Sequence, residues 1–335
     1  MRREIGLFAE LPLWDNLGLA LLKTLRGKRD RGDARAFLDG MPVSLEAIAD
    51  RIRTGQGPEG RFREFIIHDP KKRLISAPCF ADRVLHHAVM NVCERVFERW
   101  LISQSYACRT GLGLRAAIRE AEKWVNRKAW YLQMDVKHYF ETVPRQALLA
   151  KLERLFGEAE MLRLWTAIVC SHRPGECRGM PIGALTSQHL ANFYLGFLDR
   201  FIKEELRIRG YARYMDDLVL WHDDKDTLLR AREGIVAFAG DQLGLTMKPA
   251  ILNRVSGGMD FLGFRFQPGW VGLSRRSRRR FRQRIRGYER AWAQGWLTER
   301  ELQDRATAAL AFITPAQTRQ IRRQLVEESL YDADA

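Results

Sequence analysis

Two adjacent aspartates inside an apolar stretch constrain this chain more than any other feature of its sequence. The stretch reads GYARYMDDLVLWHDD, residues 210–224, and the pair is Asp216 and Asp217. Neighbouring carboxylates repel each other, and burial raises the cost of ionising them further. Successive side chains on a strand point to opposite faces, so both carboxylates can serve one site only where the chain turns. The stretch therefore predicts two strands with the aspartate pair at the bend between them.

A third carboxylate lies in a similar setting. Asp135 ends the apolar run AWYLQMD, residues 129–135, which reads as another strand. Three carboxylates at neighbouring strand ends make an oxygen-rich site that suits two Mg²⁺ ions, with Mn²⁺ as the alternative. Two such ions about 4 Å apart clamp the attacking and leaving oxygens of phosphoryl transfer, and their charge offsets the repulsion between the aspartates. The simpler alternative is a polar turn that binds no ligand.

The charge of the chain points to a polyanionic partner. Its 335 residues carry a formal net charge of +15, and 46% of them are hydrophobic, which is enough for a globular core. A positive surplus of this size favours nucleic acid as the partner. No apolar run approaches the ~18 residues that span a bilayer, and the first residues lack a signal-peptide layout. We therefore expect a cytoplasmic protein without membrane contact, whose five cysteines are reduced.

The aspartates belong to an ordered series of motifs that resembles the reverse transcriptase family. YMDD, residues 214–217, resembles the catalytic motif C of that family. LQMDVKHYFETVP resembles motif A, GMPIGALTSQHLANFYL motif B, LGLTMKP motif D and MDFLGFRF the primer grip, while KKRLISAPCFADRVLHHAV and SYACRTGLGLRAA resemble the blocks that precede them. The resemblance implies an α+β fold of the right-hand polymerase type, with fingers, a palm built on an antiparallel sheet and a small helical thumb.

The resemblance also implies the residues that carry the chemistry. Asp135, Asp216 and Asp217 would be catalytic and would hold two Mg²⁺ ions, with the Val136 carbonyl as a further metal ligand. Of the two adjacent aspartates, Asp216 would bind metal more directly.

A second set of residues is implied for the incoming nucleotide. Lys71 and Arg73 would hold its triphosphate, unless they are ordinary surface charges. Tyr139, with Phe140 beside it, would block a ribose 2′-hydroxyl and so select deoxynucleotides, unless both rings are core packing. Lys248 stands where the family often has a general acid for the departing pyrophosphate.

Motif B departs from the common form of the family. PIGALTSQ places Ile182 where Gln is usual and Gln188 where Pro is usual, both in the segment that contacts the incoming nucleotide. The IGxxxSQ form resembles the reverse transcriptases of diversity-generating retroelements, which copy a template RNA with errors at adenines. Ile offers no amide hydrogen bond and is stiff at its first side-chain torsion, so the check on base-pair geometry is expected to be looser. The alternative is sequence drift with ordinary fidelity.

An arginine-rich segment follows the motifs. SRRSRRRFRQRIRGYERAW, residues 274–292, holds nine arginines, and Phe281, Ile285, Tyr288 and Trp292 recur on one helical face. Nine like charges on a helix repel one another without a partner, so we expect the basic faces to lie along the backbone of a template–primer. The residues expected to contact nucleic acid are Arg275, Arg278, Arg279, Arg282 and Arg286. A solvated charge run is the alternative.

The chain divides accordingly into four expected parts. These are an N-terminal helical extension (1–60), fingers (61–130), a palm (131–268) with a primer-grip hairpin near 258–266, and a helical thumb (269–335). The longer segment GMDFLGFRFQPGWVGLS, residues 258–274, predicts a β-hairpin.

The resemblance implies a function and a set of partners. The expected enzyme is an RNA-directed DNA polymerase that makes cDNA from a dedicated structured RNA, error-prone and part of a diversity-generating retroelement. Its expected partners are that RNA, an RNA–DNA hybrid, deoxynucleoside triphosphates, and either a small accessory protein or further copies of the chain. Three alternatives stay open: an anti-phage defence reverse transcriptase that copies a non-coding RNA, an inactive RNA-binding scaffold, and, less favoured, a group II intron maturase.

Overall fold

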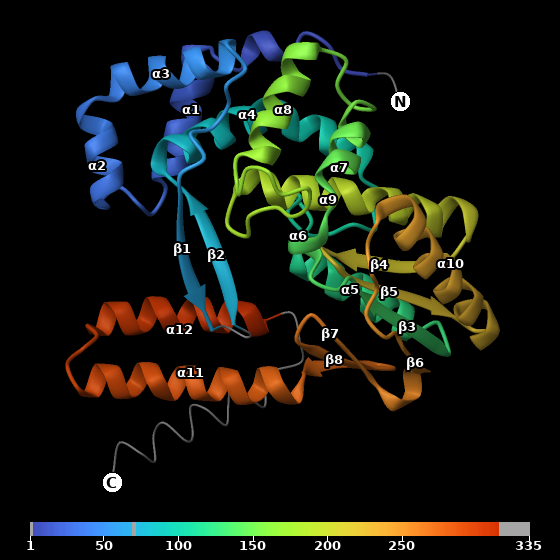
Figure 1. Cartoon of the computed structure of the whole chain (residues 1–335). Helices are drawn as coiled ribbons and strands as arrows, with labels where there is room; N and C mark the ends of the chain where they lie inside the picture. Colours follow the sequence, from blue (N-terminus) through green and yellow to red (C-terminus); the bar gives the residue numbers. More distant parts are fainter. Residues whose placement is uncertain (1–2, 69–71, 315–335) are drawn as a thin grey trace.

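A four-stranded antiparallel sheet forms the centre of the molecule. The computed structural model describes residues 3–68 and 72–314 of the chain (Figure 1). The strand order is β4-β5-β3-β6, with β4 at Gly210–Tyr214, β5 at Asp217–His222, β3 at Trp130–Asp135 and β6 at Ile251–Arg254. A two-residue turn, Met215 and Asp216, joins β4 to β5. The prediction of two strands with the aspartate pair at their bend is confirmed.

Both faces of this central sheet are covered, because its strands alternate between two hydrophobic cores. Leu218 and Leu220 of β5 belong to the larger core, which includes residues of α9 and α10, whereas Val219 and Trp221 belong to a second core with α5. The covering helices are α5 (Leu114–Val125), α9 (Leu185–Arg200), which continues as the π-helical turn Phe201–Glu205, and α10 (Lys225–Leu243). Two-sided burial fixes the strand register, since a slip of one residue would exchange the two faces.

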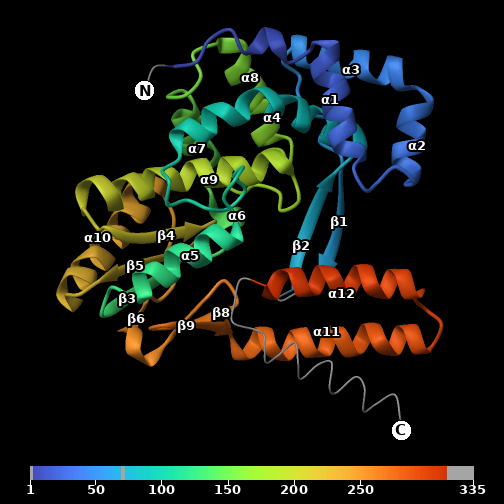
Figure 2. The same cartoon turned by 180° about the vertical axis from the view of Figure 1, so that it is seen from behind.

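The N-terminal third packs helices around α4. These helices are α1 (Trp14–Leu25), α2 (Gly32–Asp39), α3 (Met41–Arg53) and α4 (Phe80–Trp100), preceded by a short 3-10 turn at Phe8–Glu10. Between α3 and α4 the chain forms an antiparallel hairpin of β1 (Phe62–Ile67) and β2 (Arg73–Pro78). Both views show this hairpin projecting from the helical part toward α12 (Figures 1 and 2). Helices α6 (Tyr139–Thr142), α7 (Arg145–Leu152) and α8 (Ala159–Cys170) lie between β3 and α9 in the chain.

The segment expected to form a single hairpin forms three strands instead. They are β7 (Met259–Phe261), β8 (Phe264–Gln267) and β9 (Trp270–Leu273), all antiparallel, after a 3-10 turn at Val255–Gly257. The first reversal uses Leu262 and Gly263, which both have positive φ, as a tight hairpin turn of the right twist requires. The second reversal, at Pro268 and Gly269, adds the strand that the prediction lacked.

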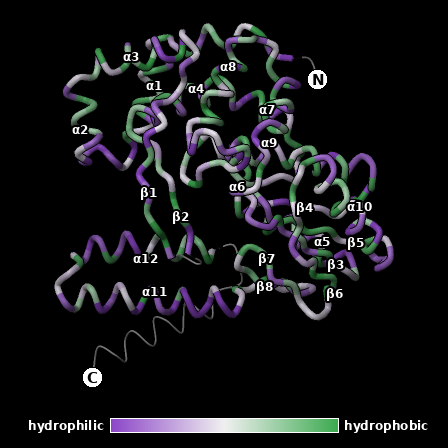
Figure 3. Tube along the Cα trace, in the orientation of Figure 1, coloured by the Kyte–Doolittle hydropathy of each residue, from purple (hydrophilic) through white to green (hydrophobic). Residues whose placement is uncertain are grey.

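Two long helices complete the described chain. Helices α11 (Arg275–Ala293) and α12 (Glu299–Ile313) lie side by side, with α12 between α11 and the β1–β2 hairpin in both views (Figures 1 and 2). Figure 3 shows hydrophilic residues along most of α11. The Ser274 side chain caps α11 and Thr298 forms a capping box at α12, which satisfies backbone donors that would otherwise lack partners. Across residues 3–68 and 72–314, no helix combines the length and the apolar character needed to cross a membrane.

Candidate active site

The three predicted aspartates meet at one end of the central sheet. Asp135, the last residue of β3, pairs with Asp217, the first residue of β5. Asp216 lies in the turn that joins β4 to β5. Met215, the other turn residue, has a φ of +55°, a left-handed conformation that bulky side chains rarely adopt. The sheet therefore delivers three carboxylates from two neighbouring strand ends and one tight turn.

Burial makes these carboxylates reluctant to ionise. Burial raises the pKa of Asp217 to about 7, helped by the charges of Asp135 and Asp216, although a hydrogen bond from Gln133 (Nε2 to Oδ1, 3.1 Å) opposes the rise. Burial, followed by the charge of Asp135, also raises the pKa of Asp216. Such shifts are expected where carboxylates are gathered to receive a cation.

Asp135 already has one cationic partner. The Lys248 ammonium lies 2.5 Å from Asp135 Oδ2, and the Lys248 backbone N–H donates to the Asp135 carbonyl at 2.8 Å. Asp135 Oδ1, by contrast, is buried and has no hydrogen-bond partner. Burying a carboxylate oxygen without a hydrogen-bond partner costs free energy. A ligand that contacts Oδ1 would remove this cost.

The positions of the three carboxylates test whether they could hold the predicted Mg²⁺ ions. Among the residues that the structure describes, no three His, Cys, Asp or Glu side chains are arranged to hold a metal ion. At this site Asp135 pairs with Lys248 and Asp217 accepts from Gln133, while the three carboxylates still interact through their charges. The donor set nevertheless fits a hard cation, because the Asp135 Oδ1 atom lacks a partner and the pKa values of Asp216 and Asp217 are raised.

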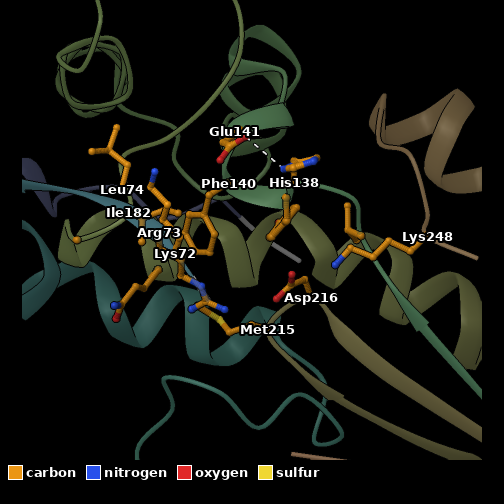
Figure 4. Close-up of a pocket in the computed structure, with 14 residues that line it drawn as sticks. Lys72, Arg73, Leu74, His138, Phe140, Glu141, Ile182, Met215, Asp216 and Lys248 are labelled. Atoms are coloured by element: carbon orange, nitrogen blue, oxygen red, sulfur yellow. Dashed lines mark ion pairs between the residues drawn. The ribbon is translucent and has the colours of Figure 1, made fainter. Parts of the chain in front are cut away.

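A cavity of about 500 Å³ opens beside Asp216. It is lined by Lys72, Arg73, Leu74, Val136, His138, Tyr139, Phe140, Glu141, Ile182, Gly183, Gln188, Met215, Asp216 and Lys248. Figure 4 shows the Phe140 ring in the middle of this lining, with Asp216 and Lys248 to one side and Lys72 and Arg73 to the other. Lys72, just before β2, and Arg73, the first residue of β2, thus lie across the cavity from Asp216.

The residues predicted to bind nucleotide lie at this cavity with two differences. Arg73 and Lys248 line it as expected, but Lys71 lies outside the described residues, and the exposed Lys72 lines the cavity. Tyr139 is buried and its hydroxyl donates to the Ala191 carbonyl of α9 at 2.5 Å, so its polar end is committed to the core. Phe140, which is half-buried, offers the more accessible ring. The doubled lysine before Arg73 was the available sequence signal for Lys72.

Motif B is fastened to the β1–β2 hairpin through its backbone. The Ser76 N–H of β2 donates to the Ile182 carbonyl at 2.8 Å. Gly183 has a φ of +124°, and a Cβ there would lie 2.9 Å from the Ile75 side chain and 3.1 Å from the Ser76 carbonyl. Only glycine tolerates both the conformation and the close approach. Gln188, one turn into α9, is exposed and lines the same cavity.

The predicted nucleic-acid-binding arginines lie on α11, apart from the cavity lining. Arg275, Arg278, Arg279 and Arg286 are exposed and Arg282 is half-buried. The predicted apolar face is only partly covered: Phe281 is buried and Ile285 packs against the second core, whereas Trp292 is 49% exposed. Tyr288 of the same face is half-buried and lies under the Arg305 guanidinium of α12, so the covering of the face lessens toward the end of the helix.

Comparison with known proteins decides the family. Residues 67–266 match the family described as "Reverse transcriptase (RNA-dependent DNA polymerase)". The chain belongs to the reverse transcriptase family. The matched range includes β2, the central sheet and the carboxylate turn, and the fold is the α+β right hand expected of a reverse transcriptase.

Several curated proteins are similar to this chain over part of their length. Protein YkfC of Escherichia coli (strain K12) is 25% identical over 186 residues, which cover 52% of this chain and 49% of that protein. The putative COX1/OXI3 intron 1 protein of Saccharomyces cerevisiae is 21% identical over 199 residues, covering 56% and 24%. The group II intron-encoded protein LtrA of Lactococcus lactis subsp. cremoris is 23% identical over 140 residues, covering 39% and 23%. The chain thus spans about half or less of these relatives.

Solved telomerase structures also resemble this reverse transcriptase in part. Telomerase from Candida albicans with a fragment of telomeric RNA has a TM-score of 0.49 at 10% identity, covering 64% of this chain and 46% of that one. Apo telomerase from Candida tropicalis, truncated from its C-terminal domain, has the same TM-score at 13% identity, covering 67% and 58%.

Proposed function

We propose that this reverse transcriptase is an active RNA-directed DNA polymerase. The observation that carries the proposal is the group formed by Asp135, Asp216 and Asp217 at the edge of a cavity of nucleotide size. The raised pKa values of Asp216 and Asp217 and the unpartnered Oδ1 of Asp135 favour cations there. The substrates are deoxynucleoside triphosphates and a primer annealed to structured RNA. The division into extension (1–60), fingers (61–130), palm (131–268) and thumb (269–335) is part of this proposal.

The residues at the cavity have separate roles in this proposal. Asp135, Asp216 and Asp217 hold two Mg²⁺ ions, with the Val136 carbonyl as a further ligand. The chemistry that such ions would supply is activation of the attacking 3′-oxygen and neutralisation of charge on the departing pyrophosphate. Arg73 draws the triphosphate to the cavity by charge, as does Lys72 beside it.

Two further residues of the cavity complete the proposed site. Phe140, with Tyr139 packed behind it, stands against the sugar and disfavours a 2′-hydroxyl. Lys248 gives a proton to the departing pyrophosphate, a role supported by its contact with Asp135 at 2.5 Å. The support for both roles is that these side chains line the same cavity as Asp216.

Primer extension on an RNA template tests the proposed activity. Asp216→Asn removes a charge that holds metal while keeping the side-chain size, so we expect extension to fall by at least ~10²-fold, since each metal contributes several kcal/mol to the transition state. Asp226→Asn is the matched control, because Asp226 is an exposed aspartate on α10, and its extension rate should equal that of the wild type. Comparable extension by Asp216→Asn and the wild type would rule out this site as the polymerase centre.

We further propose that synthesis is error-prone and serves a diversity-generating retroelement. The support is Ile182, which lines the cavity, is held there by the Ser76 hydrogen bond to its carbonyl, and has no amide to contact a nascent base pair. Discrimination is a difference of affinities, so a loss of ~1–3 kcal/mol raises misincorporation roughly 10–200-fold. The error is expected to be largest opposite template adenine, whose pair has fewer hydrogen bonds to check.

Sequencing of cDNA from one RNA that carries all four bases tests this finer proposal. Ile182→Gln restores an amide at similar volume and should lower errors opposite adenine more than opposite the other bases, with little loss of extension. Ile182→Leu keeps an apolar side chain and serves as the control, which should retain the wild-type error pattern. A wild type that copies adenine as accurately as the other bases contradicts the proposal.

A second candidate differs in the RNA that is copied. The names of LtrA and the yeast COX1/OXI3 protein refer to introns, and LtrA is called a group II intron-encoded protein. These similarities favour a structured intron RNA as the alternative template. Sequencing the RNA that copurifies with the chain separates an intron from a template repeat.

A further inference from the structure

A fully buried ion pair lies directly behind the carboxylate turn. Arg213 of β4 and Asp199 of α9 are both 0% exposed, and two short contacts join them, Nε to Oδ1 and Nη2 to Oδ2, each at 2.6 Å. The Tyr211 hydroxyl donates to the same Asp199 Oδ1 at 2.6 Å. A buried ion pair is weak evidence for stability, because apolar residues of similar volume often stabilise a core equally well. Its position suggests another use.

The guanidinium reaches from α9 to the turn itself. Nη1 donates to the Met215 carbonyl at 2.9 Å and to Asn192 Oδ1 at 2.8 Å, while Nη2 donates to Ser105 Oγ at 2.9 Å. A fork of fixed geometry therefore links α9, the 104–107 segment and the turn in one rigid arrangement.

The backbone around Arg213 is fixed as well. Its N–H donates to the Gln104 carbonyl at 2.9 Å, and its carbonyl accepts from the Tyr106 N–H at 3.0 Å. The segment that supplies these partners is in turn joined to α9, because the Asn192 side chain donates to the Ala107 carbonyl at 2.5 Å. Arg213 therefore cannot shift without moving β4, α9 and this segment together.

The Met215 carbonyl is the atom through which such an arrangement can act on Asp216. It belongs to the peptide unit that joins Met215 to Asp216, so its direction sets the plane from which the Asp216 side chain departs. Met215 has a φ of +55°, which glycine usually supplies at a two-residue hairpin turn. A strained turn of this kind persists only where its surroundings hold it. The Arg213 hydrogen bond to the carbonyl is such a restraint.

We propose that Arg213 is a positioning residue that holds the Met215–Asp216 peptide in the orientation in which Asp216 binds metal, with Asp199 and Asn192 fixing the guanidinium. The proposal rests on the proposed function, in which Asp216 is a metal ligand. It connects the metal site to α9, the helix that follows Ile182 and carries Gln188, so a shift of that helix moves the carboxylate turn.

The test removes the restraint without leaving a buried charge. The variant Arg213→Met/Asp199→Leu/Tyr211→Phe replaces the pair and its hydroxyl partner by apolar side chains, and Tyr211→Phe alone is the matched control. Arg213→Lys is the second variant, since it keeps the charge opposite Asp199 but cannot also reach the Met215 carbonyl through a fork. The measurements are thermal unfolding, Mn²⁺ binding to the full chain by electron paramagnetic resonance, and primer extension with Mg²⁺.

We expect the triple variant and Arg213→Lys to bind Mn²⁺ about 10–100-fold more weakly than Tyr211→Phe, the loss typical when a metal ligand loses its supporting contact. Extension should fall with it and be partly restored by high Mg²⁺. Unchanged Mn²⁺ affinity in a folded triple variant or in Arg213→Lys overturns the proposal and shows a purely structural pair. If the wild type extends no primer while Mn²⁺ affinity still depends on Arg213, the polymerase activity fails and the positioning role stands.

Discussion

At the scale of single residues, Asp217 links stability to pH. Its pKa of about 7 means that the folded chain holds this proton more tightly than the unfolded chain, where the pKa is near 3.8. The metal-free protein therefore loses stability as pH rises from about 4 through about 7, and above that range the full cost is present. Burial is the main cause, since a carboxylate in a low-dielectric setting is poorly solvated.

Replacing Asp217 by Asn should remove this dependence. In chelator at pH 8 we expect Asp217→Asn to raise the free energy of unfolding by roughly 1–3 kcal/mol, and by less than half as much at pH 5. Thermal unfolding at both pH values measures the difference, with Asp226→Asn as an exposed control that should show none. Saturating Mg²⁺ should stabilise the wild type and not the variant. A variant less stable than the wild type at pH 8 would mean that burial does not penalise this carboxylate.

At the scale of elements, the sequence predicts those strands and helices whose formation depends on neighbouring residues in the chain. Strands β3, β4 and β5 could be predicted because charged residues bound their apolar runs. The end of α10 is also a local signal, because residue 244 is a glycine, and in the structure it adopts the left-handed conformation that ends a helix. Strand β9 could not, because its existence depends on pairing with β8 across a Pro-Gly turn that equally suits a loop.

The site shows the same division between local and long-range information. The meeting of Asp135 with Asp217 was predictable from strand ends, but the Lys248–Asp135 pair joins residues 113 positions apart and has no local signal. The hydrogen bond from the Tyr139 hydroxyl to the Ala191 carbonyl depends on how α9 packs. Arg213 was least predictable, since arginine is almost never fully buried unless paired, and its partner lies on another element.

At the scale of the whole molecule, the question is whether total charge or its placement governs binding to nucleic acid. The net charge of +15 attracts any polyanion, and this attraction falls with added salt wherever phosphates are neutralised. Helix α11 concentrates exposed arginines in a part of the molecule that buries few side chains of its own, Phe281 being the buried residue in the helix. An RNA–DNA hybrid, recognised by its shape and backbone, suits a surface of this kind.

Two variants of equal charge separate these possibilities. The first variant replaces three exposed arginines of α11 by Gln, namely Arg278, Arg279 and Arg286. The second replaces three exposed arginines before β4 and on α10, namely Arg207, Arg209 and Arg230. Both have a net charge of +12. If placement governs, only the α11 variant loses affinity for an RNA–DNA template–primer, and its slope of log K against log salt falls by up to ~3, because each phosphate contact contributes about 0.9. Binding measured across a salt series distinguishes the two. Equal losses in both variants would assign the attraction to total charge and remove α11 as the binding surface.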